Sequence, residues 1–156
     1  MIADLEQIIG VTVREVFGTM LHLPIGPDTA SQLVGGETQI ASSVGFIGQL
    51  SGVVYLYCGA SFAGRITANL LGLTATETAA AEMVNDAMGE MANMVVGNLK
   101  SRLADRGFPC VLSIPSVFRG EEFGIGSVSS AKRRVFFFRC EQSQLVVEVL
   151  FKESNS

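Results

Sequence analysis

Apolar residues recur at helical spacing through two long stretches of the chain, one over residues 2–22 and one from about residue 75 to Arg106. Side chains three and four positions apart share one face of a helix, so each stretch predicts an amphipathic helix. Gly107 and Pro109 end the second stretch, as glycine and proline commonly do. The apolar face of the first helix is expected to hold Leu5, Ile8, Ile9, Val13, Val16, Phe17 and Met20.

Capping signals refine the predicted helix boundaries. Thr74 and Glu77 have the spacing of a capping box, in which a hydroxyl and a carboxylate satisfy free backbone donors. The long helix is therefore expected to begin there. Ser61 is the predicted cap of a short helix over residues 62–71, and Gly72 follows it at a position that favours a left-handed residue.

Runs of β-branched and aromatic residues between the helices predict two hairpins. The predicted strands are residues 38–49 and 53–58 with a turn at 49–52, residues 134–140 and 145–152 with a turn at 141–144, and short runs at 111–114 and 117–118. This order of elements favours an α+β fold, a mainly antiparallel sheet covered by long helices. The length predicts a single domain over residues 1–156.

Composition narrows the class of protein. Hydrophobic residues make up 48% of the chain and charged residues 17%, which argues for compact folding and leaves apolar surface for burial between subunits.

The most apolar long stretch, residues 79–99, contains Glu82, Asp86 and Glu90, so no membrane insertion is expected. The N-terminus is acidic and lacks the basic segment of a signal peptide, which makes the cytoplasm the expected location. A net charge of −4 gives no overall attraction to nucleic acid.

Other candidate chemistry receives little support from the sequence. Cys58, Cys110 and Cys140 are widely separated and adjoin apolar residues, which favours buried thiols over a disulfide or metal site. The glycines of GFIGQLSG are expected in turns, because no helix directly follows them to bind phosphate. The basic run Lys132–Arg134 either keeps one end of the sheet solvated or helps to dock an acidic protein.

The second long helix carries a polar stripe. Asp86, Glu90, Asn93 and Gly97 follow one another at spacings of four, three and four. On a helix that advances about 100° per residue they fall within a narrow sector, so a carboxylate lies beside a carboxamide. The opposite, core-facing side is expected to hold Val84, Met88, Met91, Val95 and Leu99.

Two interpretations of this polar stripe remain open on the pattern alone. The simpler one is an exposed or partner-facing polar strip. The other is a catalytic site, because Gly89, Asn93 and Gly97 each disfavour a helix interior by about 0.5–1 kcal/mol relative to alanine. A carboxamide can donate to one oxygen and accept from another, which would orient a water molecule for in-line attack on phosphorus. Gly97 would let another backbone approach that amide closely.

The chain also shows signs of an internal duplication. A long helix followed by a hairpin occurs near residues 2–58 and again over residues 75–151. In the first half, the counterpart of the carboxylate–amide pair would lie around Glu15 and Gly18, where the amide is absent. We therefore expect one polar site per chain.

The stretch DAMGEMANMVVGNLK closely resembles the signature helix of CheX-like chemotaxis phosphatases, which are related to the CheC family. In that helix an acidic residue, a glutamate and an asparagine recur at these intervals. The similarity covers most of residues 5–150 and includes the segments REVFGTML, GFIGQLSGVVYLYC and SIPSVFRG. The resemblance implies a CheC/CheX-like domain that hydrolyses the aspartyl phosphate of a response-regulator receiver, CheY or a similar protein.

The same resemblance implies roles for the stripe residues. Asn93 would orient the attacking water, and Glu90 would pair with the active-site lysine of the receiver. Asp86 would contribute to recognition or orientation. Gly97 is the other expected partner-binding position, on the separate ground that a glycine lets another backbone approach. Mg²⁺ would be supplied by the receiver, so the chain would need no cofactor of its own, and members of the group typically form homodimers by joining sheets. The alternative is a non-catalytic signalling adaptor that binds a receiver.

Overall fold

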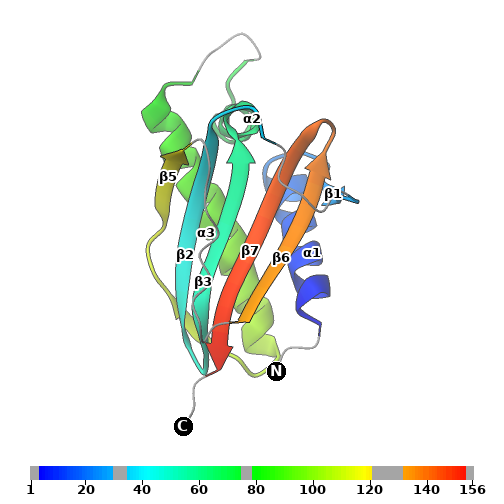
Figure 1. The fold of residues 1–156 in the computed structure, drawn as a ribbon, viewed down its shortest axis with the longest axis vertical. Helices are drawn as coiled ribbons and strands as arrows, with labels where there is room; N and C mark the ends of the chain where they lie inside the picture. Colours follow the sequence, from blue (N-terminus) through cyan, green and yellow to red (C-terminus); the bar gives the residue numbers. More distant parts are fainter. Residues whose placement is uncertain (1–3, 30–34, 75–78, 121–131, 154–156) are drawn as a thin grey trace.

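The computed structural model describes residues 4–29, 35–74, 79–120 and 132–153 (Figure 1). In chain order the elements are α1 (Leu5–Glu15), the π-helical turn η1 (Val16–Met20), β1 (Gly26–Pro27), β2 (Gln39–Gly48), β3 (Leu50–Gly59), α2 (Ala60–Leu71), α3 (Ala81–Asp105), β4 (Cys110–Leu112), β5 (Ser116–Gly120), β6 (Lys132–Cys140) and β7 (Ser143–Glu153). Among the described helices, none is both long enough and apolar enough to cross a lipid bilayer.

The strands form one seven-stranded antiparallel sheet in the order β1-β6-β7-β3-β2-β4, with β5 also paired to β2. The helices α1, α2 and α3 lie together on one face of this sheet (Figure 1). The predicted α+β fold is therefore confirmed. A sheet covered on one face should have one strongly apolar face, and this one does.

The strand order agrees with an internal duplication. The hairpin β2–β3 of the first half and the hairpin β6–β7 of the second half lie side by side through the β3–β7 pair. β1 follows α1 in the chain and pairs with β6, whereas β4 and β5 follow α3 and pair with β2. Exchanging the two halves therefore gives the same strand order read from the opposite edge.

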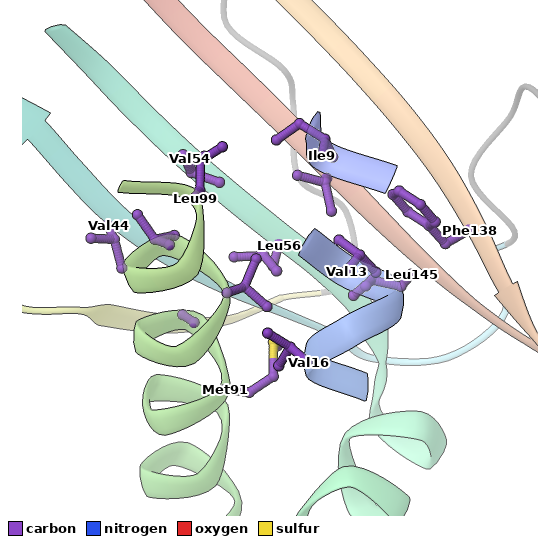
Figure 2. Close-up of a cluster of buried hydrophobic side chains, with 14 of the residues drawn as sticks. Ile9, Val13, Val16, Val44, Val54, Leu56, Met91, Leu99, Phe138 and Leu145 are labelled. Carbon is purple, nitrogen blue, oxygen red and sulfur yellow. The ribbon is translucent and has the colours of Figure 1, made fainter. Parts of the chain in front are cut away.

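The hydrophobic core fills the space between the helices and the sheet. Figure 2 shows Met91 and Leu99 of α3 gathered with Val13 of α1 and with Leu56 and Leu145 of the sheet. All of these side chains are buried. The core face predicted for the long helix is confirmed, since all its members are buried: Val84, Met88, Met91, Val95 and Leu99.

Both predicted N-caps are wrong. α3 begins at Ala81 with Ala80 as N-cap and no side-chain cap, so the pattern at Thr74 does not start it, and Glu77 lies outside the described residues. α2 has Gly59 as its N-cap. The role expected of Ser61 falls to Glu37, whose Oε2 accepts hydrogen bonds from the Ser61 N–H (3.2 Å) and hydroxyl (2.6 Å).

The hydrogen bonds from Ser61 to Glu37 could not be predicted from local sequence, because Glu37 is 24 residues away from Ser61. A carboxylate at the first turn of a helix suits the positive end of its dipole. Gly72 at the other end of α2 is left-handed, with φ of 69°, as expected.

The first helix departs from its predicted apolar face at its last turn. Residues up to Phe17 are buried as expected, but Met20 is 54% exposed and Leu21 is fully buried. The cause is the π-helical turn η1, which takes more residues per turn and so rotates the following side chains backward. A prediction that assumes 3.6 residues per turn therefore assigns the wrong face to residues that follow the π-helical turn.

The predicted hairpins form with shorter turns. β3 begins at Leu50 instead of Val53, and β7 begins at Ser143 instead of Leu145. Cys140 pairs with Ser143 in register, so only Glu141 and Gln142 make the second turn. Ser51, Ser143 and Gln144 are polar, which is typical of turns, but their backbone still pairs with a neighbouring strand.

Gly52 provides a test of this sheet. A Cβ at Gly52 would lie 1.9 Å from the Leu150 carbonyl oxygen of β7, whereas a Cβ at Gly64, inside α2, would meet nothing within 4 Å. We expect Gly52→Ala to lower the free energy of unfolding in urea by about 1–3 kcal/mol through overpacking. The matched variant Gly64→Ala should raise it by about 1 kcal/mol, because alanine favours a helix. Equal effects of the two substitutions would contradict the β3–β7 pairing.

Candidate functional site

The predicted polar stripe lies on the solvent side of α3. Asp86, Glu90 and Asn93 are exposed, and Gly97 is half-buried. Burial of the opposite face against the sheet fixes the rotation of the helix, so these positions point away from the core. The structure thus brings Glu90 and Asn93 to one surface, one turn apart.

The side chains of the stripe are unengaged within the described part of the chain. No hydrogen bond or ion pair there involves the carboxylates of Asp86 and Glu90 or the amide of Asn93. Water solvates these side chains, so a partner would not have to break contacts within the described chain to reach them. These three remain available to a molecule that approaches from solvent.

Two glycines of α3 have different surroundings. A Cβ at Gly89 would lie 3.5 Å from Pro115 Cγ and 3.8 Å from Val117 Cγ2, so the chain leading into β5 packs on this flank of the helix. A Cβ at Gly97 would meet nothing within 4 Å among the described residues. The close approach expected at Gly97 is therefore not made by this part of the chain.

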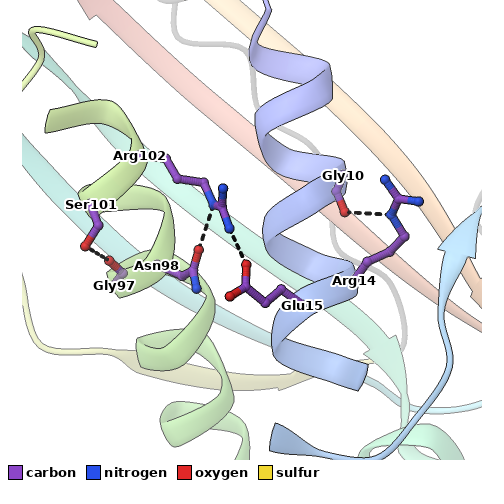
Figure 3. A network of polar contacts seen from close by, with 7 residues as sticks. All are labelled: Gly10, Arg14, Glu15, Gly97, Asn98, Ser101 and Arg102. Carbon is purple, nitrogen blue, oxygen red and sulfur yellow. Dashed lines mark hydrogen bonds and ion pairs between the residues drawn. The ribbon is translucent and has the colours of Figure 1, made fainter. Parts of the chain in front are cut away.

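Arginine side chains hold α3 at both ends. At its start, Arg119 of β5 donates from Nε to Asn85 Oδ1 (3.0 Å) and from Nη2 to the Ala81 carbonyl oxygen (3.2 Å). Near its end, Arg102 donates to Asn98 Oδ1 (2.9 Å) and pairs with Glu15 of α1 (Figure 3). Exposed pairs of this kind contribute about 0–1 kcal/mol each, so their main effect is to set the position of the helix.

The first-half counterpart of the stripe is occupied by structural contacts. Glu15 uses its carboxylate for the ion pair with Arg102. Gly18 lies in the π-helical turn and offers no amide. These facts favour one polar site per chain.

The acidic residues of α3 do not form a metal site. Glu82 and Glu90 are eight residues apart, about 12 Å along the helix axis, so the carboxylates of Glu82, Asp86 and Glu90 do not all converge on one ion. Within the described ranges, no group of three His, Cys, Asp or Glu side chains could hold a metal.

The cysteines are poor nucleophiles in this fold. Cys58, Cys110 and Cys140 are free thiols and all are buried. Burial raises the pKa of Cys58 to about 12, and burial also raises the pKa values of the other two thiols. The thiolate is the reactive form of cysteine, so these residues pack as small apolar groups, as the sequence predicted.

A buried polar cluster on the helix-free face of the sheet was missed by the sequence analysis. Glu148 is 1% exposed and accepts hydrogen bonds from the Tyr57 hydroxyl (2.8 Å) and from Arg133 Nε (2.6 Å). Neither interpretation of the basic run foresaw this contact, because it joins residues on neighbouring strands. Burial and the nearby carboxylate raise the pKa of Tyr57.

The polar stripe lies outside the cavity beside the start of α3. A cavity of about 690 Å³ lies between α2 and the start of α3, where Arg65, Asn69 and Arg119 are among its lining residues. None of the four stripe residues lines it. A protruding carboxylate–amide pair acts most directly on a reactive group that lies in a depression of another macromolecule.

Comparison with known proteins defines the class. The family model "Chemotaxis phosphatase CheX" matches residues 40–139, and the chain belongs to this family. No curated protein sequence matches the chain.

Solved structures agree on the fold. The chemotaxis protein CheX from Vibrio vulnificus is similar with a TM-score of 0.81 and 24% identity, over 96% of this chain and 97% of that one. A CheC-like superfamily protein from Shewanella sp. PV-4 gives 0.80 and 24%, over 97% and 99%. A chain of the CheX–CheY–BeF3–Mg²⁺ complex from Borrelia burgdorferi gives 0.78 and 19%, over 98% and 100%.

The buried thiol of Cys58 predicts a pH dependence of stability. In the unfolded chain this thiol ionises near pH 9, whereas in the folded chain its pKa is about 12. Above pH 9 the unfolded state binds fewer protons than the folded state, so the free energy of unfolding should fall with rising pH. The contribution of Cys58 is up to about 1.4 kcal/mol per pH unit. Urea unfolding between pH 8 and 11 should show a shallower decline for Cys58→Ala, and an equal decline would contradict the burial of this thiol.

Proposed function

We propose that this chain dephosphorylates the aspartyl phosphate of a CheY-like receiver domain. One observation carries the proposal: Glu90 and Asn93 lie one turn apart on the exposed face of α3 with no partner in the described chain. Membership of the CheX family and the solved CheX–CheY complex from Borrelia burgdorferi support a receiver as the substrate.

The geometry of α3 suits insertion into the phosphorylation site of a receiver. Asn93 and Glu90 are separated by about 4.5 Å along the helix axis, so both can enter one depression. The amide of Asn93 can accept a hydrogen bond from a water and donate to a phosphoryl oxygen, which aligns the water opposite the aspartyl oxygen. Glu90 can pair with the receiver's lysine and so fix the depth and angle of entry.

Hydrolysis then needs no covalent intermediate on this chain. The water oxygen bonds to phosphorus while the bond from phosphorus to the aspartyl oxygen breaks, and inorganic phosphate and a free carboxylate result. The receiver's Mg²⁺ supplies charge neutralisation at the phosphoryl group. Asn93 contributes position, which is a large part of catalysis when the reacting group is already activated.

Asp86 and Gly97 extend the surface on either side of this pair. Asp86 lies one turn before Glu90, where its carboxylate can meet a cationic or hydrogen-donating group at the rim of the receiver site. Gly97 lies one turn after Asn93, and the open space above it can admit a partner backbone. We assign both residues to partner binding.

We also propose a homodimer formed through the β2–β4–β5 edge of the sheet. Ile47 and Val111 pair directly in register and are 73% and 70% exposed, and Phe118 on β5 is 47% exposed. Ile47 alternates with the buried Phe46, so it lies on the face that no helix covers. Phe118 pairs with Ala41, about 20 Å along β2 from Ile47, so the exposed apolar residues extend along this edge, as an association surface would require.

Substitutions in the carboxylate–amide pair test the catalytic proposal. With phosphorylated receiver and Mg²⁺, Asn93→Ala should reduce the rate of phosphate loss about 100-fold through misplaced water, and Glu90→Gln should reduce it about tenfold. Glu82→Gln removes one negative charge from the same helix and serves as the control, with an unchanged rate. Full activity of Asn93→Ala would overturn the assignment, and receiver binding without acceleration by the wild-type chain would identify a non-catalytic adaptor.

Light scattering tests the dimer. The wild-type chain at micromolar concentration should have a mass of about twice 16.6 kDa. Val111→Asp should shift it toward the single-chain mass, because a charge in an apolar interface is expensive to desolvate. Met20→Asp places the same charge on an exposed residue of η1 and should leave the mass unchanged. A wild-type mass of 16.6 kDa would contradict the proposed dimer.

A further inference from the structure

Ile114 lies in the short link between β4 and β5 and is 86% exposed, more than any other large hydrophobic residue in the described part of the chain. Single exposed hydrophobic residues are common, so exposure by itself assigns nothing. The surroundings of Ile114 carry the inference.

The backbone on both sides of Ile114 is held in place. The preceding residue, Ser113, donates its N–H to the Gly45 carbonyl oxygen (2.9 Å), and its Oγ accepts the Gly45 N–H (2.8 Å). The following residue, Pro115, packs against the flank of α3 at Gly89. A side chain on such a supported backbone can be buried by a partner with little further loss of conformational entropy.

The same contact places Ile114 beside the polar stripe. Pro115 lies against Gly89, and Gly89 immediately precedes Glu90. Adjacent Cα atoms are about 3.8 Å apart, so the Ile114 Cα lies within about 10 Å of the flank of α3 at Gly89, well inside the footprint of a docked domain. A partner domain that covers Glu90 and Asn93 would also reach the Ile114 side chain.

We propose that Ile114 is an apolar specificity contact for the receiver, beside the polar contacts made by α3. This inference rests on the proposed function and adds to it a property of the substrate. The favoured receivers carry an apolar side chain next to the phosphorylation pocket, facing Ile114. A receiver with a charged group there would have to desolvate it against isoleucine without a partner, and would bind less well.

Ile114 and the proposed dimer surface have different neighbours. Ile47, Val111 and Phe118 are exposed on the β2–β4–β5 edge, and Ile47 lies on the helix-free face. Pro115 and Val117, by contrast, contact the helix side at Gly89. The backbone next to Ile114 is therefore tied to α3 through Pro115, and the mass of Ile114→Ser in solution separates a receiver contact from a contact between copies of this chain.

Direct binding measurements test this assignment without dependence on turnover. The receiver of the same organism, activated with BeF3⁻ and Mg²⁺, is titrated calorimetrically into the wild-type chain, Ile114→Ser and Leu71→Ser. Leu71 is 49% exposed at the end of α2 and is the matched control. Ile114→Ser should weaken binding about tenfold, equivalent to about 1.4 kcal/mol, while Leu71→Ser leaves it within about twofold. With phosphorylated receiver, Ile114→Ser should raise KM by a similar factor and leave kcat unchanged.

Each other outcome is decisive. Equal binding by Ile114→Ser and the wild-type chain, or an equal loss for Leu71→Ser, would overturn the role of Ile114. A halved mass of Ile114→Ser in light scattering would also overturn it, in favour of a contact between copies of this chain. If the wild-type chain itself neither binds the activated receiver nor accelerates phosphate loss, the proposed function fails first, and the inference fails with it.

Discussion

The packing of the apolar face of α3 against the sheet sets the orientation on which the proposed site depends. Met88, Met91 and Val95 are completely buried in the main core. Because a helix is rigid about its axis, burial of this face turns Glu90 and Asn93 outward. Loss of this packing would lower the stability of the fold and would also change the direction in which Glu90 and Asn93 point. The same buried contacts therefore support both the fold and the proposed site.

The supports around α3 come from segments distant in sequence. Arg119 of β5 holds the first turn, Pro115 packs on the flank at Gly89, and Arg102 connects the last turns to α1. Together they hold α3 in place while its polar stripe stays exposed. In the proposed reaction the chain supplies one positioned amide and one carboxylate, and the receiver supplies the phosphoryl group and the metal.

Local periodicity predicted a large part of this arrangement. The spacing of apolar residues identified the core face of the long helix, and the alternation of β-prone runs with turns identified both hairpins. These features could be read from the sequence because each depends on residues a few positions apart. The polar stripe followed from the same period, and the resemblance to a family gave it a chemical interpretation.

The features that escaped prediction depend on contacts across the fold. The cap of α2 comes from Glu37, the partner of Arg133 is Glu148 on a neighbouring strand, and the flank of Gly89 is filled by Pro115. The π-helical turn displaced Met20 from the core for a different reason, since it changes the residue period itself. No local pattern encodes these partners.

If the exposed stripe acts on a separate receiver molecule, one chain should dephosphorylate many receivers in turn. The most direct measurement follows phosphate release from receiver in large molar excess over this chain, in the presence of Mg²⁺. The account predicts that each chain dephosphorylates many receivers, at a rate proportional to the amount of chain added. Phosphate release at the receiver's own rate, independent of the amount of chain, would contradict it.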